Sequence, residues 1–270
     1  MTIESALQRL EAVIDGIDAM AVAVSGGIDS LTLATLAGRR AGSRVEMFHA
    51  ISAAVPDGAV TRIEALAAEE GWRLRLIRAG ELDRREYVAN PVDRCLHCKR
   101  ALYTTIGAHT QAQIVSGANR DDLGDYRPGL RAAQESSVRH PYVEAGIGKS
   151  EVRSIARMLG LGALAELPAS PCLSSRVETG IAIHAPMLRR IDAAEQLLRE
   201  STGATAVRCR VRHSGVVIEL DEAALARLGA EARDRLARRV GELFTRPDGL
   251  PVPAFAPYRM GSAFVGSRDD

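Results

Sequence analysis

The sequence predicts an α/β protein in which a parallel β-sheet domain is followed by a smaller α+β domain. In the first part of the chain, short apolar β-type segments alternate with helical segments, and strands connected by helices of this length form parallel sheets. The second part shows one helix followed by two strands of alternating apolar residues. We place the boundary at Cys172, which gives domains of residues 1–172 and 173–270.

The elements of the first domain follow from apolar spacing and from helix stop signals. Leu7, Leu10 and Ile14 share one face of an N-terminal helix, and a second helix runs from Asp29 to a stop at Gly42. Strands are expected at residues 19–24, 45–51, 74–77 and 114–117, and further helices at residues 60–70, 98–109 and 150–160. Because parallel strands end at one edge of a sheet, Ser25, Ser52 and Gly117 should lie at that edge.

The second domain has a simpler pattern. A helix is expected at residues 184–200, strands at 206–212 and 216–220, and a charged amphipathic helix at 222–244. The tail from Arg246 contains Pro251, Pro253 and Pro257, which predicts an extended or partly ordered arm.

Composition narrows the class of protein. The 270 residues include 35 Lys and Arg and 34 Asp and Glu, which gives a net charge of +1. The chain therefore lacks the strongly positive surface that is typical of nucleic-acid-binding proteins. The acidic N-terminal segment is unlike a signal peptide, and no apolar run approaches the roughly 20 residues that span a bilayer. We expect a cytoplasmic protein with no membrane partner. In that compartment, four cysteines predict thiol chemistry or metal binding, not disulfides.

The segment from Ser25 to Ser30, SGGIDS, links the first strand to its helix. Its two glycines let backbone N–H groups converge on an anion, and the helix N-terminus adds further donors. A Walker A loop needs four residues between its glycines followed by Lys, and a dinucleotide fingerprint needs three spaced glycines, so neither fits. The segment therefore predicts a phosphate cradle, against the alternative of a Gly-Gly turn between core elements.

Cys95 and Cys98 form a CxxC pair. Lys99 stands where a c-type haem site needs His, and a zinc ribbon needs a second CxxC that this chain lacks. A thioredoxin-like redox pair, a three-thiolate site completed by Cys172, and two buried structural cysteines remain as hypotheses. Arg94, Lys99 and Arg100 favour the thiolate form and hence a chemical role.

Cys172 follows a proline in the segment SPCLSSR, four residues before Arg176. A thiol in such a loop is accessible and can attack an acyl-adenylate, although an ordinary loop cysteine is the alternative. Cys209 alternates with Arg208 and Arg210 in a predicted strand, so we assign it to the core.

Two polar clusters are further candidates. Asp121, Asp122 and Asp125 lie in a loop after the fourth strand, where acids can hold Mg²⁺ while Arg127 and Arg131 neutralise phosphate, although a solvated loop has the same composition. Arg210 and Arg212 share one face of a strand and suit an anionic substrate, unless that strand is a solvated edge.

Several segments, in this order along the chain, resemble the LarE family of ATP-dependent sulfur transferases, which act in nickel-pincer nucleotide biosynthesis. They are SGGIDS at 25–30, NPVDRCLHCK at 90–99, GANRDDLGDYRPGLRAAQE at 117–135, EAGIGKSEVRSIARMLGL at 144–161, SPCLSSR at 170–176 and RVRHSG at 210–215. The likeness covers Ala21 to about Leu220. It implies a Rossmann-like PP-loop ATP pyrophosphatase domain.

The resemblance also implies a chemistry. ATP would adenylate a carboxylate of a pyridinium dicarboxylate mononucleotide, and a sulfur nucleophile would displace AMP and give a thiocarboxylate. In one branch of the family the cysteine matching Cys172 gives up its own sulfur. In another, three cysteines hold a [4Fe-4S] cluster, and the presence of Cys95, Cys98 and Cys172 favours that branch here.

The site residues that the resemblance implies fall into four groups. Cys172 and Asp29 are the catalytic candidates; Ser25, Gly26, Gly27, Asp29, Ser30 and Gly117 bind ATP; Arg176, Glu195, Arg210 and Arg212 bind substrate; Cys95, Cys98 and Cys172 hold the cluster. The expected cofactors are ATP, Mg²⁺ and the [4Fe-4S] cluster. The expected partners are a small nucleotide substrate, a sulfur donor that the sequence does not identify, and further copies of the chain in a homo-oligomer.

Two other enzyme classes share parts of this pattern. A tRNA-thiolating PP-loop enzyme would carry RNA-binding modules or several CxxC pairs and a basic surface, and an amidotransferase-type synthetase using ammonia would not need the three cysteines. A non-enzymatic nucleotide sensor would bind ATP without releasing pyrophosphate.

Overall fold

A computed structural model describes residues 2–124, 127–168, 171–244 and 252–263. The chain divides into two compact units. Unit 1 comprises residues 1–52, 57–81 and 93–170, and unit 2 comprises residues 53–56, 82–92 and 171–270. Unit 2 thus takes two segments from the first half of the chain, 53–56 and 82–92, which the sequence alone does not assign to it.

Unit 1 is built on a four-stranded parallel sheet of strand order β3-β2-β1-β4. The strands are β1 (Met20–Ala23), β2 (Val45–Ala50), β3 (Leu74–Ile77) and β4 (Gln113–Ser116). In β1, Met20 and Val22 face one hydrophobic core while Ala21 and Ala23 face another, as expected for a strand buried on both sides. The predicted α/β class with a parallel sheet is confirmed.

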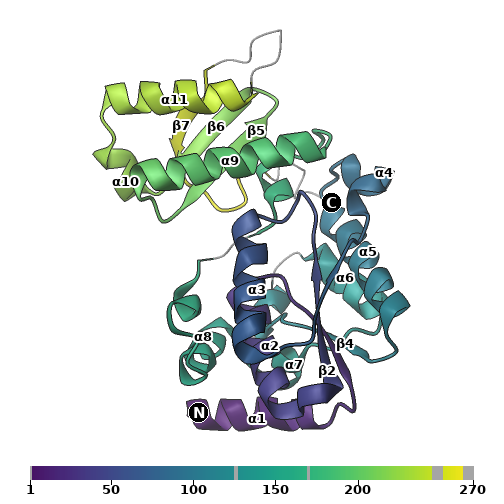
Figure 1. The fold of residues 1–270 in the computed structure, drawn as a ribbon. Helices are drawn as coiled ribbons and strands as arrows, with labels where there is room; N and C mark the ends of the chain where they lie inside the picture. The colour runs from purple at the N-terminus through teal and green to yellow at the C-terminus, as the bar shows by residue number, and fades with distance from the viewer. Residues whose placement is uncertain (1, 125–126, 169–170, 245–251, 264–270) are drawn as a thin grey trace. The chain divides into compact units, whose positions relative to one another are not determined.

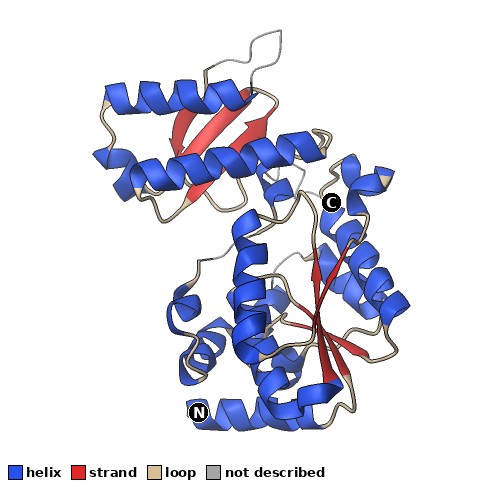
Figure 2. Ribbon diagram, in the orientation of Figure 1, coloured by secondary structure: helices blue, strands red, loops and turns tan. Residues whose placement is uncertain are grey.

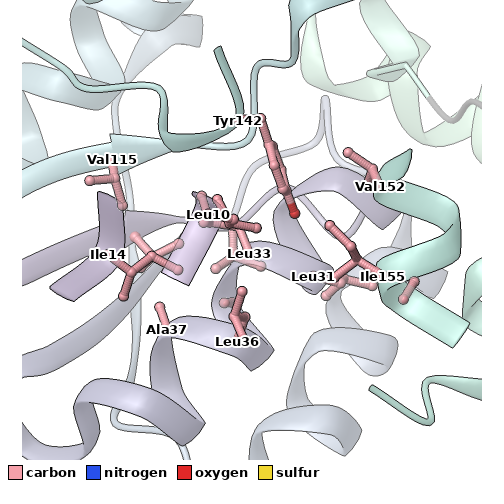
Figure 3. Packing of buried hydrophobic residues seen from close by; sticks show 14 of the residues in the cluster. Leu10, Ile14, Leu31, Leu33, Leu36, Ala37, Val115, Tyr142, Val152 and Ile155 are labelled. Atoms are coloured by element: carbon pink, nitrogen blue, oxygen red, sulfur yellow. The ribbon is translucent and has the colours of Figure 1, made fainter. Parts of the chain in front are cut away.

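Helices cover both faces of this sheet (Figures 1 and 2). One core contains residues of α1 (Ile3–Asp15), α2 (Ile28–Ala41), α3 (Asp57–Glu70) and α8 (Lys149–Met158). The other contains residues of α5 (Arg94–His109) and α6 (Pro128–Glu135). Figure 3 shows the first core, in which Leu10 and Ile14 of α1 lie beside Leu33 of α2. This layering leaves the carboxyl ends of the strands to the loops.

Unit 2 contains a three-stranded sheet of order β5-β6-β7, with β5 and β6 antiparallel and β6 and β7 parallel. Its elements are α4 (Arg85–Val88), α9 (Ala185–Thr202), β5 (Val207–Arg212), β6 (Gly215–Leu220), α10 (Glu222–Arg227), α11 (Ala230–Phe244) and β7 (Ala254–Pro257). Asn90 attaches segment 82–92 to this unit, because its side-chain amide donates to the carbonyls of Glu178 and Ile181 at 2.8 and 3.0 Å.

The remaining elements are α7 (Pro141–Glu144) and the 3₁₀ turns η1 (Gly42–Arg44), η2 (Glu81–Asp83), η3 (Arg120–Gly124), η4 (Gly162–Glu166) and η5 (Leu173–Arg176). Within the described ranges, no helix has the length and apolar content needed to cross a membrane.

The structure corrects the bounds of several expected helices. The helix expected from Cys98 begins at Arg94, because buried Leu96 already belongs to its apolar face. The helix expected from Ser150 begins at Lys149, with Gly148 as its N-cap. The single helix expected at residues 222–244 is two helices, α10 and α11, interrupted before Ala230.

The expected arm after Arg246 is also corrected. Residues 254–257 form β7, which pairs in parallel with β6. Main-chain pairing with β6 outweighs the proline content, and Pro257 stands at the last position of the strand. Arg246 and Pro251 lie outside the described residues.

Candidate functional site

The loop from Ser25 to Ser30 connects the end of β1 to the start of α2 in unit 1. Gly26 has a φ of +81°, a left-handed conformation that favours glycine. Gly27 is the N-cap of α2, and no side chain caps this helix. The first-turn N–H groups of α2 are therefore left without a side-chain acceptor at the carboxyl edge of the sheet, where an anion can bind them.

Two serine side chains fix the shape of this loop. The Ser30 hydroxyl donates to the Gly27 carbonyl at 3.0 Å and accepts from the Ser25 backbone N–H at 3.0 Å. The two hydroxyl oxygens lie 3.1 Å apart. Ser30 is buried, so it acts on the loop itself, whereas Ser25 is exposed and can also reach a ligand.

Gly117, directly after β4, approaches the same loop from the neighbouring strand. A Cβ atom on this residue would lie 2.9 Å from the Asp29 carbonyl carbon and 2.9 Å from the Ser30 nitrogen. Only glycine allows β4 and the start of α2 to approach this closely. The structure thus brings Gly117 to Ser25–Ser30, as the sequence predicts.

Asp29 is held by three neighbours in unit 1. Its carboxylate pairs with the Lys149 ammonium group and accepts from the Asn119 side-chain amide at 3.3 Å. The Tyr142 hydroxyl donates to the Asp29 carbonyl at 3.0 Å. Burial raises the pKa of Tyr142 well above its usual value, with the Asp29 charge as a second cause, so Tyr142 acts as a donor.

Lys149 is a functional candidate that the sequence analysis missed. It begins α8, and its side chain keeps 37% of its exposure beside Asp29. The signal was present in the sequence as Gly-Lys-Ser at a helix start, far from the glycine loop and without its spacing.

The predicted acidic loop has internal partners. Asp121 accepts from the Lys149 backbone N–H at 2.8 Å, and Asp122 forms an ion pair of 2.8 Å with Arg127. Arg131 pairs with Glu135 instead. Asp125 lies outside the described residues. In the part of the chain that the structure describes, no three His, Cys, Asp or Glu side chains form a group able to hold a metal. The described acids therefore contact Lys149 and Arg127, and Mg²⁺ binding by them stays a prediction.

Cys95 and Cys98 lie in the first two turns of α5, in unit 1. Their spacing of three places both thiols on one side of the helix, and both residues are half-buried. Cys172 belongs to unit 2, and none of the four cysteines, all of them within the described ranges, is in a disulfide. Cys209 is fully buried, and burial raises the pKa of its thiol, which confirms its assignment to the core.

Cys172 is the N-cap of the short turn η5. It is half-buried, whereas the four residues of the turn are buried. The Leu173 N–H donates to the Ala54 carbonyl at 2.8 Å, and the Ser174 and Tyr87 hydroxyl oxygens lie 2.6 Å apart. The two inserted segments of unit 2 thus hold the turn that carries Cys172.

Arg176, at the end of this turn, forms a buried ion pair with Glu195 of α9. Its Nε and Nη2 atoms lie 2.8 and 3.0 Å from the two carboxylate oxygens of Glu195. Burial lowers the pKa of Arg176, but hydrogen bonds to Glu195 and its charge outweigh burial, so the pKa is raised. The two side chains are 1% and 0% exposed. Their charges therefore neutralise each other inside unit 2.

Arg210 and Arg212 share one face of β5, as their spacing predicts, and both pair with Glu219 of β6 at 3.0 Å. Arg210 is buried and also donates to the Ser175 carbonyl at 2.9 Å. Arg212 is half-buried and lines a pocket of about 290 Å³ together with Arg190 and His213. Arg212 thus contributes a cationic side chain to this pocket of unit 2.

Comparison with known proteins finds relatives that cover most of the chain. Over 99% of its length it is 29% identical to pyridinium-3,5-bisthiocarboxylic acid mononucleotide synthase of Lactiplantibacillus plantarum, and it covers 98% of that protein. It is 36% identical to an uncharacterized protein of Synechocystis sp. over 222 residues, which is 81% of this chain and 82% of the relative. The chain belongs to the LarE family.

Another relative of this LarE-family chain is an uncharacterized protein of Methanocaldococcus jannaschii. It is 28% identical over 208 residues, which cover 74% of this chain and 77% of the relative. No protein-family model matches the chain. The fold agrees with the family: a Rossmann-like parallel sheet with the glycine loop at its first strand, and a small second domain.

Proposed function

We propose that this LarE-family protein is an ATP-dependent sulfur transferase. It adenylates a carboxylate of a pyridinium dicarboxylate mononucleotide and converts it to a thiocarboxylate, as a step of nickel-pincer cofactor biosynthesis. The observation that carries the proposal is the cradle formed by Ser25–Ser30 and Gly117 at the carboxyl edge of the sheet. The name of the Lactiplantibacillus plantarum relative, a mononucleotide synthase that makes thiocarboxylic acids, supports the substrate class.

In the first step, a carboxylate oxygen of the substrate attacks the α-phosphorus of ATP. The bond to the bridging oxygen of the β-phosphate breaks, and pyrophosphate leaves with both electrons of that bond. The N–H groups at the start of α2 and the Ser25 hydroxyl bind the leaving pyrophosphate. The fit rests on Gly26 and Gly117, where a side chain would fill the space around the loop.

Asp29 and Lys149 have complementary roles in this step. The Asp29 carboxylate binds the Mg²⁺ of MgATP, since this ion is held by one or two carboxylates together with substrate phosphates. With the Asp29 carboxylate on MgATP, the Lys149 ammonium group would be free to pair with the phosphate oxygens. The Lys149 side chain is 37% exposed and the Asp29 side chain is 25% exposed, so MgATP can reach both groups.

In the second step, a sulfur nucleophile attacks the acyl carbon and AMP leaves with the electrons of the acyl–oxygen bond. Cys95, Cys98 and Cys172 are the proposed ligands of a [4Fe-4S] cluster, which would supply sulfide as the nucleophile. The one-turn spacing of Cys95 and Cys98 supports their part of this ligand set. Cys172 lies in unit 2, and its part rests on the sequence and the family resemblance. In the alternative route, the Cys172 thiolate attacks the acyl carbon, AMP leaves, and a thioester forms. Removal of the Cys172 Cα proton then breaks the Cβ–S bond, which leaves dehydroalanine at position 172 and the sulfur in the thiocarboxylate.

The substrate phosphate is assigned to Arg212. This arginine lines a pocket with Arg190 and His213, and no acidic residue is among the described residues that line it. Arg190 is half-buried and has no hydrogen bond or ion pair within the described chain. Together with His184, the pocket offers two arginines and two histidines, which suit a phosphate dianion better than a single carboxylate that one arginine can saturate. A homo-oligomer remains part of the proposal.

The test measures products and metal on protein purified without oxygen. Wild type is expected to release pyrophosphate from ATP only with the mononucleotide present, and to form the thiocarboxylate. It should contain about four irons per chain, the full complement of a [4Fe-4S] cluster. Cys95→Ala should lose the iron and the thiocarboxylate, whereas Cys209→Ala, a buried cysteine outside the proposed site, should keep both.

Two results separate the routes. If the protein lacks iron and each turnover lowers the mass of the chain by one H₂S at Cys172, the elimination route holds and the cluster proposal fails. Release of pyrophosphate with ammonia incorporated in place of sulfur would contradict sulfur transfer altogether.

A further inference from the structure

Arg176 reaches back over its own turn to the residues that precede it. Its Nη1 atom donates to the Pro171 carbonyl at 2.7 Å and lies 3.2 Å from the Cys172 carbonyl. The same nitrogen lies 3.0 Å from the Ser175 hydroxyl. Hydrogen bonds from a charged guanidinium group are short and strong, so this contact restrains the backbone on both sides of the Cys172 Cα atom.

Glu195 holds that guanidinium group in place. Besides Arg176, its carboxylate accepts from Arg199 at 2.8 Å and from the Cys209 backbone N–H at 3.1 Å. The two oxygens therefore take four hydrogen bonds, which is the usual capacity of a carboxylate. Glu195 is 0% exposed, so its contacts lie within the protein.

The rest of the turn is fixed by other contacts. Leu173 binds the Ala54 carbonyl, Ser174 contacts Tyr87, and the Ser175 carbonyl accepts from Arg210. The Cys172 carbonyl accepts two hydrogen bonds. One comes from the Ser175 backbone N–H at 3.0 Å, and the other comes from the guanidinium group of Arg176. Loss of Arg176 thus leaves residues 173–175 anchored and affects chiefly the position of Cys172.

We infer that Arg176 and Glu195 are positioning residues for Cys172. Glu195 orients the guanidinium, the guanidinium fixes the Pro171–Cys172 backbone, and the half-buried thiol is thereby held in one direction. The inference rests on the proposed function for the use made of this thiol. It replaces direct substrate contact as the role of Arg176 and Glu195, because both side chains are buried and their polar atoms bind protein groups.

The main test is Arg176→Lys in the full chain. Lysine keeps the charge and can pair with Glu195, but it lacks the fork that binds Glu195 and two carbonyls together. We expect kcat for thiocarboxylate formation to fall by about 100-fold, the cost of a reacting group misplaced by about 1 Å. KM for ATP and for the mononucleotide should stay within about twofold, as expected when binding contacts are unchanged. Pyrophosphate release in a single turnover should also be unchanged.

Chemical rescue distinguishes positioning from a general loss of structure. In Arg176→Ala, millimolar guanidinium is expected to restore part of the lost kcat by occupying the vacated space, whereas ammonium at the same concentration should not. Arg199→Gln is the matched control, because Arg199 contacts Glu195 but no atom of the Cys172 turn among the hydrogen bonds of the described chain. Its kcat should remain at the wild-type level.

A raised KM with unchanged kcat in Arg176→Lys would show that Arg176 contacts substrate, and would overturn the inference. So would an equal loss of pyrophosphate release, or full activity.

Hydrogen exchange gives a readout independent of turnover. The amide of Ser175, which donates to the Cys172 carbonyl, should exchange faster in Arg176→Lys and in Arg176→Ala, while those of β6 should not change. Asp221→Asn, which weakens the cap of α10 in the same unit, should leave the Ser175 amide unaffected. Unchanged exchange at Ser175 in the Arg176 variants would contradict the inference. If wild type makes no thiocarboxylate but the exchange changes as expected, the proposed function fails and the positioning role stands.

Discussion

The loop at Ser25–Ser30 and the turn at Cys172–Arg176 both present a candidate reactive group from a short connection, but they are built differently. The loop of unit 1 depends on backbone geometry: a left-handed Gly26, an uncapped helix start and the close approach of Gly117. The turn of unit 2 depends on buried charged side chains, above all Arg176 and Glu195. The first type of site is sensitive to added atoms, and the second to removed charge.

Removal of charge in unit 2 should have the largest effect on stability. Glu195→Gln leaves Arg176 buried without its counter-charge, and breaking a buried ion pair from one side costs about 3–5 kcal/mol. Arg199→Gln is the control: Arg199 is 43% exposed, and its loss leaves the buried Glu195 paired with Arg176, so its cost should be clearly smaller. Urea denaturation followed by circular dichroism measures both. Equal effects of the two variants would show that burial does not set the strength of this network.

An added methyl group in unit 1 should have the next largest effect. Gly117→Ala places a Cβ atom 2.9 Å from the backbone of the loop, and overpacking of this kind costs about 1–3 kcal/mol. Binding of MgATP, measured by calorimetry, should weaken with it. Gly107→Ala is the matched control: this exposed glycine of α5 has open space around it, and alanine there should stabilise the helix by about 0.5–1 kcal/mol. Unimpaired MgATP binding in Gly117→Ala would show that the close approach is not needed.

Lys149→Met should change stability little, because a half-exposed ion pair contributes less than about 1 kcal/mol. Its effect on the rate of pyrophosphate release should be large, about 100-fold, as when one donor to a developing negative charge is lost. Lys149→Arg keeps the charge and should retain part of the rate. A variant Lys149→Met with normal release would remove Lys149 from the candidate site.

The smallest expected effect is a dependence of the stability of unit 1 on pH. His49 is 2% exposed, and its Nδ1 lies 2.8 Å from the Val24 carbonyl, directly before the loop. Burial lowers the pKa of His49, and the hydrogen bond to Val24 offsets this only in part. The unfolded chain therefore binds a proton more readily, so stability should fall as pH drops below about 6.5.

Urea denaturation at pH 7.5 and at lower pH measures this loss. His49→Gln should reduce the dependence of the free energy of unfolding on pH. His109→Gln, at an exposed position of α5, should leave that dependence unchanged. A steeper slope in His49→Gln would reverse the sign argued here.

The two regions also differ in what the sequence could predict. The loop of unit 1 was predictable because glycines and a helix start have local causes, and Ser25, Gly26, Gly27 and Ser30 follow one another in the chain. Gly117 followed from the shared edge of parallel strands. Lys149 was not predictable in this way, because its pairing with Asp29 depends on how α8 packs beside α2.

In unit 2 the residue types were predictable but their surroundings were not. Arg210 and Arg212 alternate as a strand requires, yet nothing local indicates that Glu219 of the neighbouring strand receives both. Arg176 and Glu195 are 19 residues apart, and their pairing needs η5 and α9 in contact. Burial of a charge depends on its partner, and the partner is set by tertiary structure.

The way the chain is divided between the two units has a consequence for biosynthesis. Asn90 is translated well before Val177–Ile181, the stretch whose carbonyls its side chain binds, with α5 to α8 of unit 1 made in between. On the ribosome, the segment around Asn90 must therefore wait without these bonds while unit 1 acquires its sheet. β7, which completes the second sheet, is made after the other elements that the structure describes. Contacts between residues far apart in the sequence slow folding and leave partly folded intermediates that expose apolar surface and aggregate. Folding of this protein should therefore depend on chaperones more than its size suggests.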